Sequence, residues 1–219
     1  VISPLSVGQG GAALGGRGAH QEEESGPMIA ARWREAFFRT VQNNENASLF
    51  RQAAQAEDLA GWTAYLTDAV VGTCQTLGWR AAAKGHHLDL LPIPHAEYLT
   101  LDVMAFAGSA RGGWRFPVAA MELENSPYSE RIAYSLWKVL CVRAELRIVF
   151  CYRSLSRQAP ALVNCLSRDV IGALPLEQRL ALEGETLVVV GSRSDSSAFP
   201  YGFFKWWRLE GNTGSFNVL

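Results

Sequence analysis

Apolar residues at helical spacing mark the beginning of the patterned part of the chain. Trp33, Phe37 and Val41 recur at intervals of four residues. This spacing places all three side chains on one face of a helix. We therefore predict an amphipathic helix over residues 30–42, with that face packed on a core.

A second stretch of helical pattern follows at residues 47–77. We expect two helical pieces around Gly61, because glycine weakens a helix interior, and an end at Gly78. Residues 79–98 are irregular and contain prolines, so they predict connecting loop with one short strand at 87–91.

The second half of the chain predicts mostly strands. Residues 98–108 and 114–125 are two apolar runs separated by a glycine-containing turn, which predicts a hairpin. A helix is expected at 129–144, with Ser129 as its N-cap. The remaining predicted elements are a continuously apolar strand at 145–153, a helix at about 160–174, and strands at 185–194 and 202–211.

This order of elements predicts the fold class. A helix between two consecutive strands implies a crossover connection and locally parallel strands, whereas the hairpin is antiparallel. We therefore expect an α/β protein with a mixed central sheet flanked by helices. Residues 28–219 are long enough for a single domain. Residues 1–27 contain seven glycines and predict a disordered tail, with the folded protein beginning near Met28. The first residue is Val, which fits either an alternative start codon or an upstream region translated in error.

Composition adds limits but no function. The net charge is −1 and 19% of the residues are charged, so no overall field attracts nucleic acid or membrane. No run of about 18 apolar residues is present to span a bilayer. The four cysteines occur singly, without metal-ligand spacing, and predict reduced thiols in a cytoplasmic protein. They are Cys74, Cys141, Cys151 and Cys165.

The most informative chemistry lies in "PVAAMELENS", residues 117–126. Glu122 and Glu124 are two residues apart at the end of an apolar strand, so they share one face of it. Asp102 lies on the preceding strand of the hairpin and can approach them. Like charges held together in a partly buried place are costly unless a cation lies between them. We therefore predict a Mg²⁺ or Mn²⁺ site formed by Asp102, Glu122 and Glu124, although a strand end that meets solvent would also tolerate the glutamates.

These residues resemble the PD-(D/E)xK, or restriction endonuclease-like, nuclease superfamily. The resemblance covers residues 48–155 and the order α-β-β-α-β, with Asp102 on one strand and Glu122-Leu123-Glu124 on the next. It implies Mg²⁺-dependent hydrolysis of phosphodiester bonds, with DNA as substrate. Glu124 occupies the position of the family lysine. The resemblance therefore implies that Glu124 binds metal or orients water, and that Lys138 on the following helix replaces the lysine.

Alternatives remain at each step. Lys138 also fits a solvated helix face, and Glu57 is a further helical candidate for assisting the metal. A nuclease fold that has lost its chemistry could bind nucleic acid or a protein partner, and a homodimer is compatible with either case. A sugar hydrolase using Glu122 and Glu124 fits less well, because its two carboxylates normally flank the substrate from different elements.

Two basic stretches are further candidates for nucleic-acid contacts. "FFKWWR", residues 203–208, combines aromatic and basic residues as single-strand-binding surfaces do, but alternation also fits a packed edge strand. Arg111, Arg115 and Arg131 flank the acidic residues in sequence and could contact phosphates or simply solvate loops.

Overall fold

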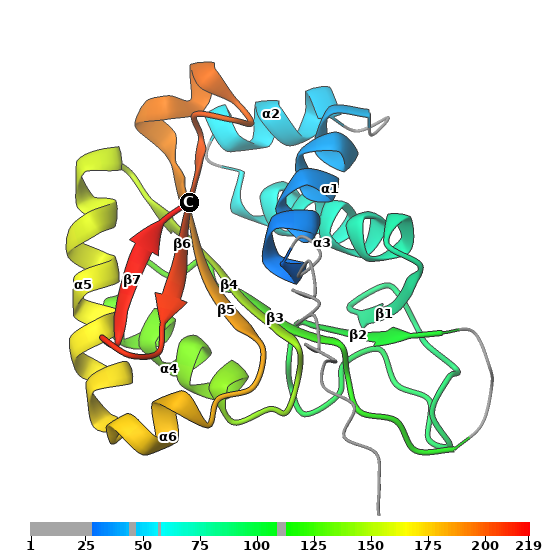
Figure 1. Ribbon diagram of the computed structural model, residues 1–219. Coiled ribbons are helices and arrows are strands. Elements are labelled where there is room, and N and C mark those ends of the chain that lie inside the picture. The colour runs from blue at the N-terminus through cyan, green and yellow to red at the C-terminus, as the bar shows by residue number, and fades with distance from the viewer. Residues whose placement is uncertain (1–27, 44–46, 57, 109–112) are drawn as a thin grey trace, which may run out of the picture.

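A computed structural model describes residues 28–43, 47–56, 58–108 and 113–219 (Figure 1). The tail predicted to be disordered, residues 1–27, lies outside the described residues, as do Glu57 and Arg111. The described chain confirms the expected fold class, an α/β protein built on a mixed sheet.

The sheet has seven strands, and their spatial order is their order in the chain. The central strands β3, β4 and β5 are parallel, and every other neighbouring pair is antiparallel. The strands are β1 (Trp79–Ala83), β2 (Val103–Ala107), β3 (Ala119–Leu123), β4 (Leu146–Arg153), β5 (Glu185–Ser192), β6 (Phe204–Glu210) and β7 (Ser215–Val218). The predicted hairpin and the predicted parallel pairing across the following helix are both confirmed.

Helices cover both faces of the sheet (Figure 1). One face is covered by α1 (Ile29–Asn43), α2 (Ala47–Ala56) and α3 (Leu59–Thr76), and the other by α4 (Ser129–Leu140) and α5 (Ala159–Asp169). The short helix α6 (Leu176–Leu180) precedes β5. Three 3₁₀ turns complete the helical part of the described chain: η1 (Ser156–Gln158), η2 (Ile171–Ala173) and η3 (Arg193–Ala198).

Two cores result from the alternation of side chains along the central strands. In β4, Ile148 and Phe150 pack with α1–α3, whereas Val149 and Cys151 pack with α4 and α5. Because both faces are covered, most positions on either face are apolar, which explains the nearly continuous apolar sequence. Glu122 in β3 and Arg147 in β4 are charged residues that are nevertheless buried in the described sheet.

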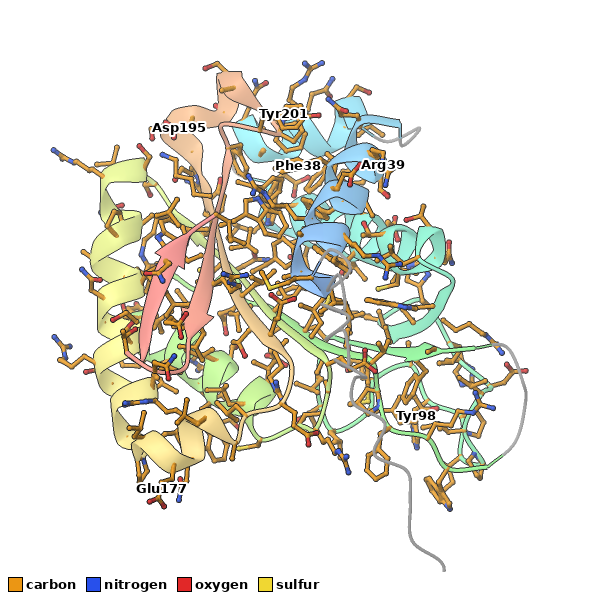
Figure 2. All side chains as sticks on the ribbon, in the orientation of Figure 1. Phe38, Arg39, Tyr98, Glu177, Asp195 and Tyr201 are labelled. Atoms are coloured by element: carbon orange, nitrogen blue, oxygen red, sulfur yellow. The ribbon has the colours of Figure 1, made fainter. Side chains whose placement is uncertain are left out.

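Aromatic side chains dominate the core beneath α1. Trp33 and Phe37 are fully buried, and the predicted apolar face of this helix is confirmed. At its outer end Phe38 packs against Tyr201, with ring centroids 4.6 Å apart (Figure 2). Trp206 and Trp207 are 2% and 5% exposed and enter opposite cores, so the 203–208 stretch offers neither ring for base stacking. It forms β6, which is covered by β7 and is therefore not the edge strand expected.

Several element boundaries differ from those expected. β1 lies in the stretch expected to be irregular, and the strand expected at 87–91 is replaced by an isolated bridge between Leu88 and His95. The break within 47–77 lies before Leu59 instead of at Gly61, because Asp58 caps the new helix by accepting a hydrogen bond from the Gly61 N–H.

Three further corrections concern the ends of elements. β2 begins only at Val103, because Leu99 and Thr100 have positive φ and form a turn. Ser129 is the first residue of α4, and Tyr128 occupies the N-cap position assigned to the serine. Helix α6 and strand β7 were not predicted. No helix within the described ranges is long and apolar enough to cross a membrane.

Candidate functional site

Asp102 and Glu122 meet at the end of the sheet where β3 finishes. Val103 pairs with Met121 in the antiparallel ladder, so one step further Asp102 lies opposite Glu122. Directly opposed residues in such a pair share a face of the sheet. Asp102 Oδ2 accepts a hydrogen bond of 2.7 Å from the Leu123 N–H, which fixes the aspartate across the two strands.

Glu122 is a buried carboxylate beneath α4. Its side chain is 5% exposed, and Lys138 Nζ lies 2.8 Å from its Oε1. Ser135, one turn earlier on the helix, donates a hydrogen bond of 3.1 Å from Oγ to Oε2. Lys138 Nζ also donates to the Thr100 carbonyl oxygen at 2.9 Å. The lysine therefore does not lie on a solvated helix face, because its charge is directed to the acidic end of β3.

Glu124 shares the face of Glu122 but is held differently. Its Oε1 accepts a hydrogen bond of 2.7 Å from the Ser126 N–H, and Ser135 Oγ lies 3.5 Å from its Oε2. The Ser135 hydroxyl thus lies between the two glutamates. Sequence reasoning did not identify Ser135, although its position three residues before Lys138 on one helix face was a usable signal.

The electrostatics of this corner are dominated by the burial of Glu122. Burial raises the pKa of Glu122 above its ordinary value, and the contact with Lys138 opposes the rise. The neighbouring negative charge of Asp102 adds to the rise, while the charge of Lys138 and the hydroxyl of Ser135 lower it. Because the pKa stays raised, one lysine does not fully offset the burial of this carboxylate beside Asp102.

The donor atoms suit a hard divalent cation with few protein ligands. Glu122 Oε1 is buried and, apart from the ion pair, has no hydrogen-bond partner within the described part of the chain. Mg²⁺ is commonly held by one or two carboxylates and keeps several waters, which fits Asp102 and Glu122. No group of three or more His, Cys, Asp or Glu residues in the described ranges is arranged to hold a metal. The role of Glu124 as a third ligand stays a prediction.

The arginines named from the sequence do not join this corner. Arg115 donates to the carbonyl oxygen of Ala107, at the end of β2 opposite to Asp102, and Arg131 is exposed on α4. Glu57 and Arg111 are outside the described ranges, so their proposed roles stay predictions.

Comparisons of the chain with models of protein families, with curated proteins and with solved structures found no match. The resemblance to the nuclease superfamily therefore rests on the order of the elements and on Asp102, Glu122 and Lys138.

Proposed function

We propose that the protein is a Mg²⁺-dependent nuclease that hydrolyses phosphodiester bonds of DNA. The observation that carries the proposal is the convergence of Asp102, Glu122 and Lys138 at one end of the β2–β3 pair. Two opposed carboxylates with a lysine beside them are the groups that metal-assisted phosphodiester hydrolysis needs: metal ligands and a cation near the attacking water or the phosphate.

Each residue then has a role that follows from its contacts. Asp102 and Glu122 would hold the cation, and the hydrogen bond from the Leu123 N–H fixes the Asp102 carboxylate opposite Glu122. When bound, Mg²⁺ would polarise a phosphoryl oxygen and lower the pKa of a bound water. Lys138, steadied by the Thr100 carbonyl oxygen, adds positive charge next to Glu122. Glu124 reaches the same Ser135 hydroxyl and would orient the attacking water through it.

A second candidate function is that of a nuclease fold that has lost its chemistry and binds nucleic acid or a protein partner. The ion pair of Glu122 with Lys138 favours it, because a 5%-exposed carboxylate that already has a cationic partner is stable without metal. DNA binding that is unchanged by EDTA, in a protein without cleavage activity, would support this alternative over the first.

The test is cleavage of plasmid DNA with Mg²⁺ or Mn²⁺ by the full chain. We expect Asp102→Asn, Glu122→Gln and Lys138→Met each to reduce the rate roughly hundredfold or more, because each removes a ligand or charge at the reacting phosphate. Asp89→Asn is the matched control. Asp89 forms an ion pair of 2.8 Å with Arg80, and this pair lies away from the acidic corner. Folded wild-type protein that cleaves neither DNA nor RNA, or Asp102→Asn with wild-type activity, would contradict the proposal.

A further inference from the structure

A cleft of about 430 Å³ lies at the end of the sheet where β4 and β5 finish. Its lining includes Asn125, Ser129, Arg153 and Arg193. A neighbouring hollow of about 470 Å³ shares Ser129 and Arg153 with it and adds Arg157. The two therefore form one groove, which runs past the first turns of α4 and α5. Asp195, which follows Arg193 in η3, marks this end of the sheet in Figure 2.

Arg153 presents an unneutralised charge in this groove. Its Nη1 donates to the Tyr152 carbonyl oxygen at 2.8 Å, and its Nη2 donates to Ser129 Oγ at 3.0 Å. Both acceptors are neutral, and no carboxylate in the described chain forms an ion pair with Arg153. The guanidinium is thus held in place by neutral partners with its charge available, which is an arrangement suited to a bound anion.

Other groups add positive potential from separate elements. Arg157 in η1 is exposed and likewise pairs with no described carboxylate. Arg193 lies over the ring of Tyr152, with its guanidinium carbon 5.1 Å from the ring centroid. The residues before α4 and α5, Tyr128 and Gln158, make no side-chain capping bond in the described structure. The first N–H groups of α4 therefore add partial positive charge here, whereas at α5 the Ala159 N–H donates to the Ser156 carbonyl oxygen and Pro160 has no N–H.

The groove adjoins the acidic corner. Asn125, which lines the groove, directly follows Glu124, and its amide donates to Thr63 Oγ1 on α3. The Glu124 N–H donates a hydrogen bond of 2.9 Å to the Phe150 carbonyl oxygen on β4, three residues before Arg153, so the acidic corner and the groove meet along this strand. The nearby negative charges are Glu124, bonded to Ser126, the exposed Glu130, Asp169, paired with Arg168, and Asp195, paired with Lys205.

We propose that this groove binds backbone phosphate groups of the nucleic acid that neighbour the phosphate being cleaved. Arg153 and Arg157 are the contacts. The inference rests on the proposed nuclease function for the identity of the ligand. A planar guanidinium binds phosphate oxygens in pairs, and Arg153 and Arg157 supply two such groups along the lining of the groove. Ser129 acts as a positioning residue by fixing Arg153.

The test measures binding of a fluorescent duplex oligonucleotide in EDTA, where no cleavage can occur. Arg153→Gln and Arg157→Gln should each weaken binding roughly tenfold and lower the salt slope by about one, because each removes one phosphate contact. Arg32→Gln is the matched control, since Arg32 is exposed on α1, on the other side of the sheet, without a described ion-pair partner. It should bind as the wild type does. Because Arg157 is exposed, its variant tests the groove without risk to folding.

The outcomes separate this inference from the proposed function. Arginine-dependent binding by a protein that never cleaves would support the groove and refute the nuclease. Metal-dependent cleavage with binding unaffected by both substitutions would refute the groove alone. Titration with inorganic phosphate distinguishes the source of the anion: if phosphate binds through Arg153 but the duplex does not bind, the nucleic-acid assignment is overturned.

Discussion

Lys138 and Glu122 form the interaction on which the residue-scale account depends. Their side chains are 17% and 5% exposed and their charged atoms are 2.8 Å apart. Removing one member of such a pair leaves the other buried without a partner. We expect Lys138→Met to lower the free energy of unfolding by about 2–3 kcal/mol in chemical denaturation, less than for a fully buried pair because Glu122 can take up a proton.

The control for this substitution is Lys205→Met. Lys205 and Asp195 are also 2.8 Å apart, but their side chains are 37% and 26% exposed. Water compensates such a pair when it is broken, so the loss should be below about 1 kcal/mol. Equal losses for the two variants would show that burial at Glu122 is not what makes its lysine important.

The raised pKa of Glu122 predicts a dependence of stability on pH. An acid whose pKa is higher in the folded than in the unfolded protein holds its proton longer when folded. Stability is therefore lost as pH rises above about 4.3, the ordinary glutamate pKa, and the loss ends above the raised pKa. Glu122→Gln should gain stability relative to wild type across that interval. A difference in unfolding free energy that is constant from about pH 4 to about pH 7 would contradict this.

The acidic residues were identifiable from the sequence because their chemistry is conspicuous. A carboxylate inside an apolar strand is unusual, and two-residue spacing fixes a shared face. Spacing alone could not decide the interactions of Lys138, because the pattern of α4 also fitted a lysine on the solvated face of the helix. The contact of Ser135 with Glu122 depends on where α4 packs, and the contact of Lys138 with the Thr100 carbonyl oxygen depends also on the turn at Leu99 and Thr100. No local sequence pattern shows either.

At the scale of elements, the connection into β5 depends on a glycine. Gly184 has a φ of +80°, and a Cβ there would lie 2.3 Å from the Glu145 carbonyl oxygen. That oxygen accepts a hydrogen bond of 2.8 Å from the Glu185 N–H, so the backbone cannot easily move away. We expect Gly184→Ala to lower the free energy of unfolding by more than about 3 kcal/mol, because the clash adds to the cost of a left-handed alanine.

Gly85→Ala supplies the matched comparison in thermal or chemical unfolding. Gly85 has a φ of +82°, but a Cβ added there would meet nothing within 4 Å. Only the conformational cost of about 1 kcal/mol should then appear. If both variants lose the same amount, close backbone approach is not what requires glycine at position 184.

Long elements with clear periodicity were predicted well, and short ones were not. Helix α1 and strand β4 carry 15 and 8 residues of unbroken pattern. In β1 the run of three alanines at 81–83 has neither the bulk nor the alternation that indicates a strand, and β7 has only four residues. Both become strands by pairing with a neighbouring strand, which is a tertiary property. Ala82 of β1 pairs with Met104 of β2, and Phe216 of β7 pairs with Leu209 of β6.

At the scale of the whole molecule, the sheet arranges the proposed chemistry at one end. Parallel β3 and β4 and the antiparallel β2 bring Asp102, Glu122 and Arg153 to the same side, where β3, β4 and β5 finish and β2 begins. The mixed sheet was predictable because a helix must separate parallel neighbours. The groove was not, because it combines residues from α3, α4, β4, η1, α5 and η3.

Calorimetric titration of the full chain with Mn²⁺ and Mg²⁺ tests the central claim most directly, since the claim concerns a cation between two opposed carboxylates. We expect binding of one ion with release of protons from Glu122 at pH near its raised pKa, loss of binding in Asp102→Asn and Glu122→Gln, and unchanged binding in Asp89→Asn. Absence of binding by folded wild-type protein, or binding that survives the loss of Asp102, would contradict the account.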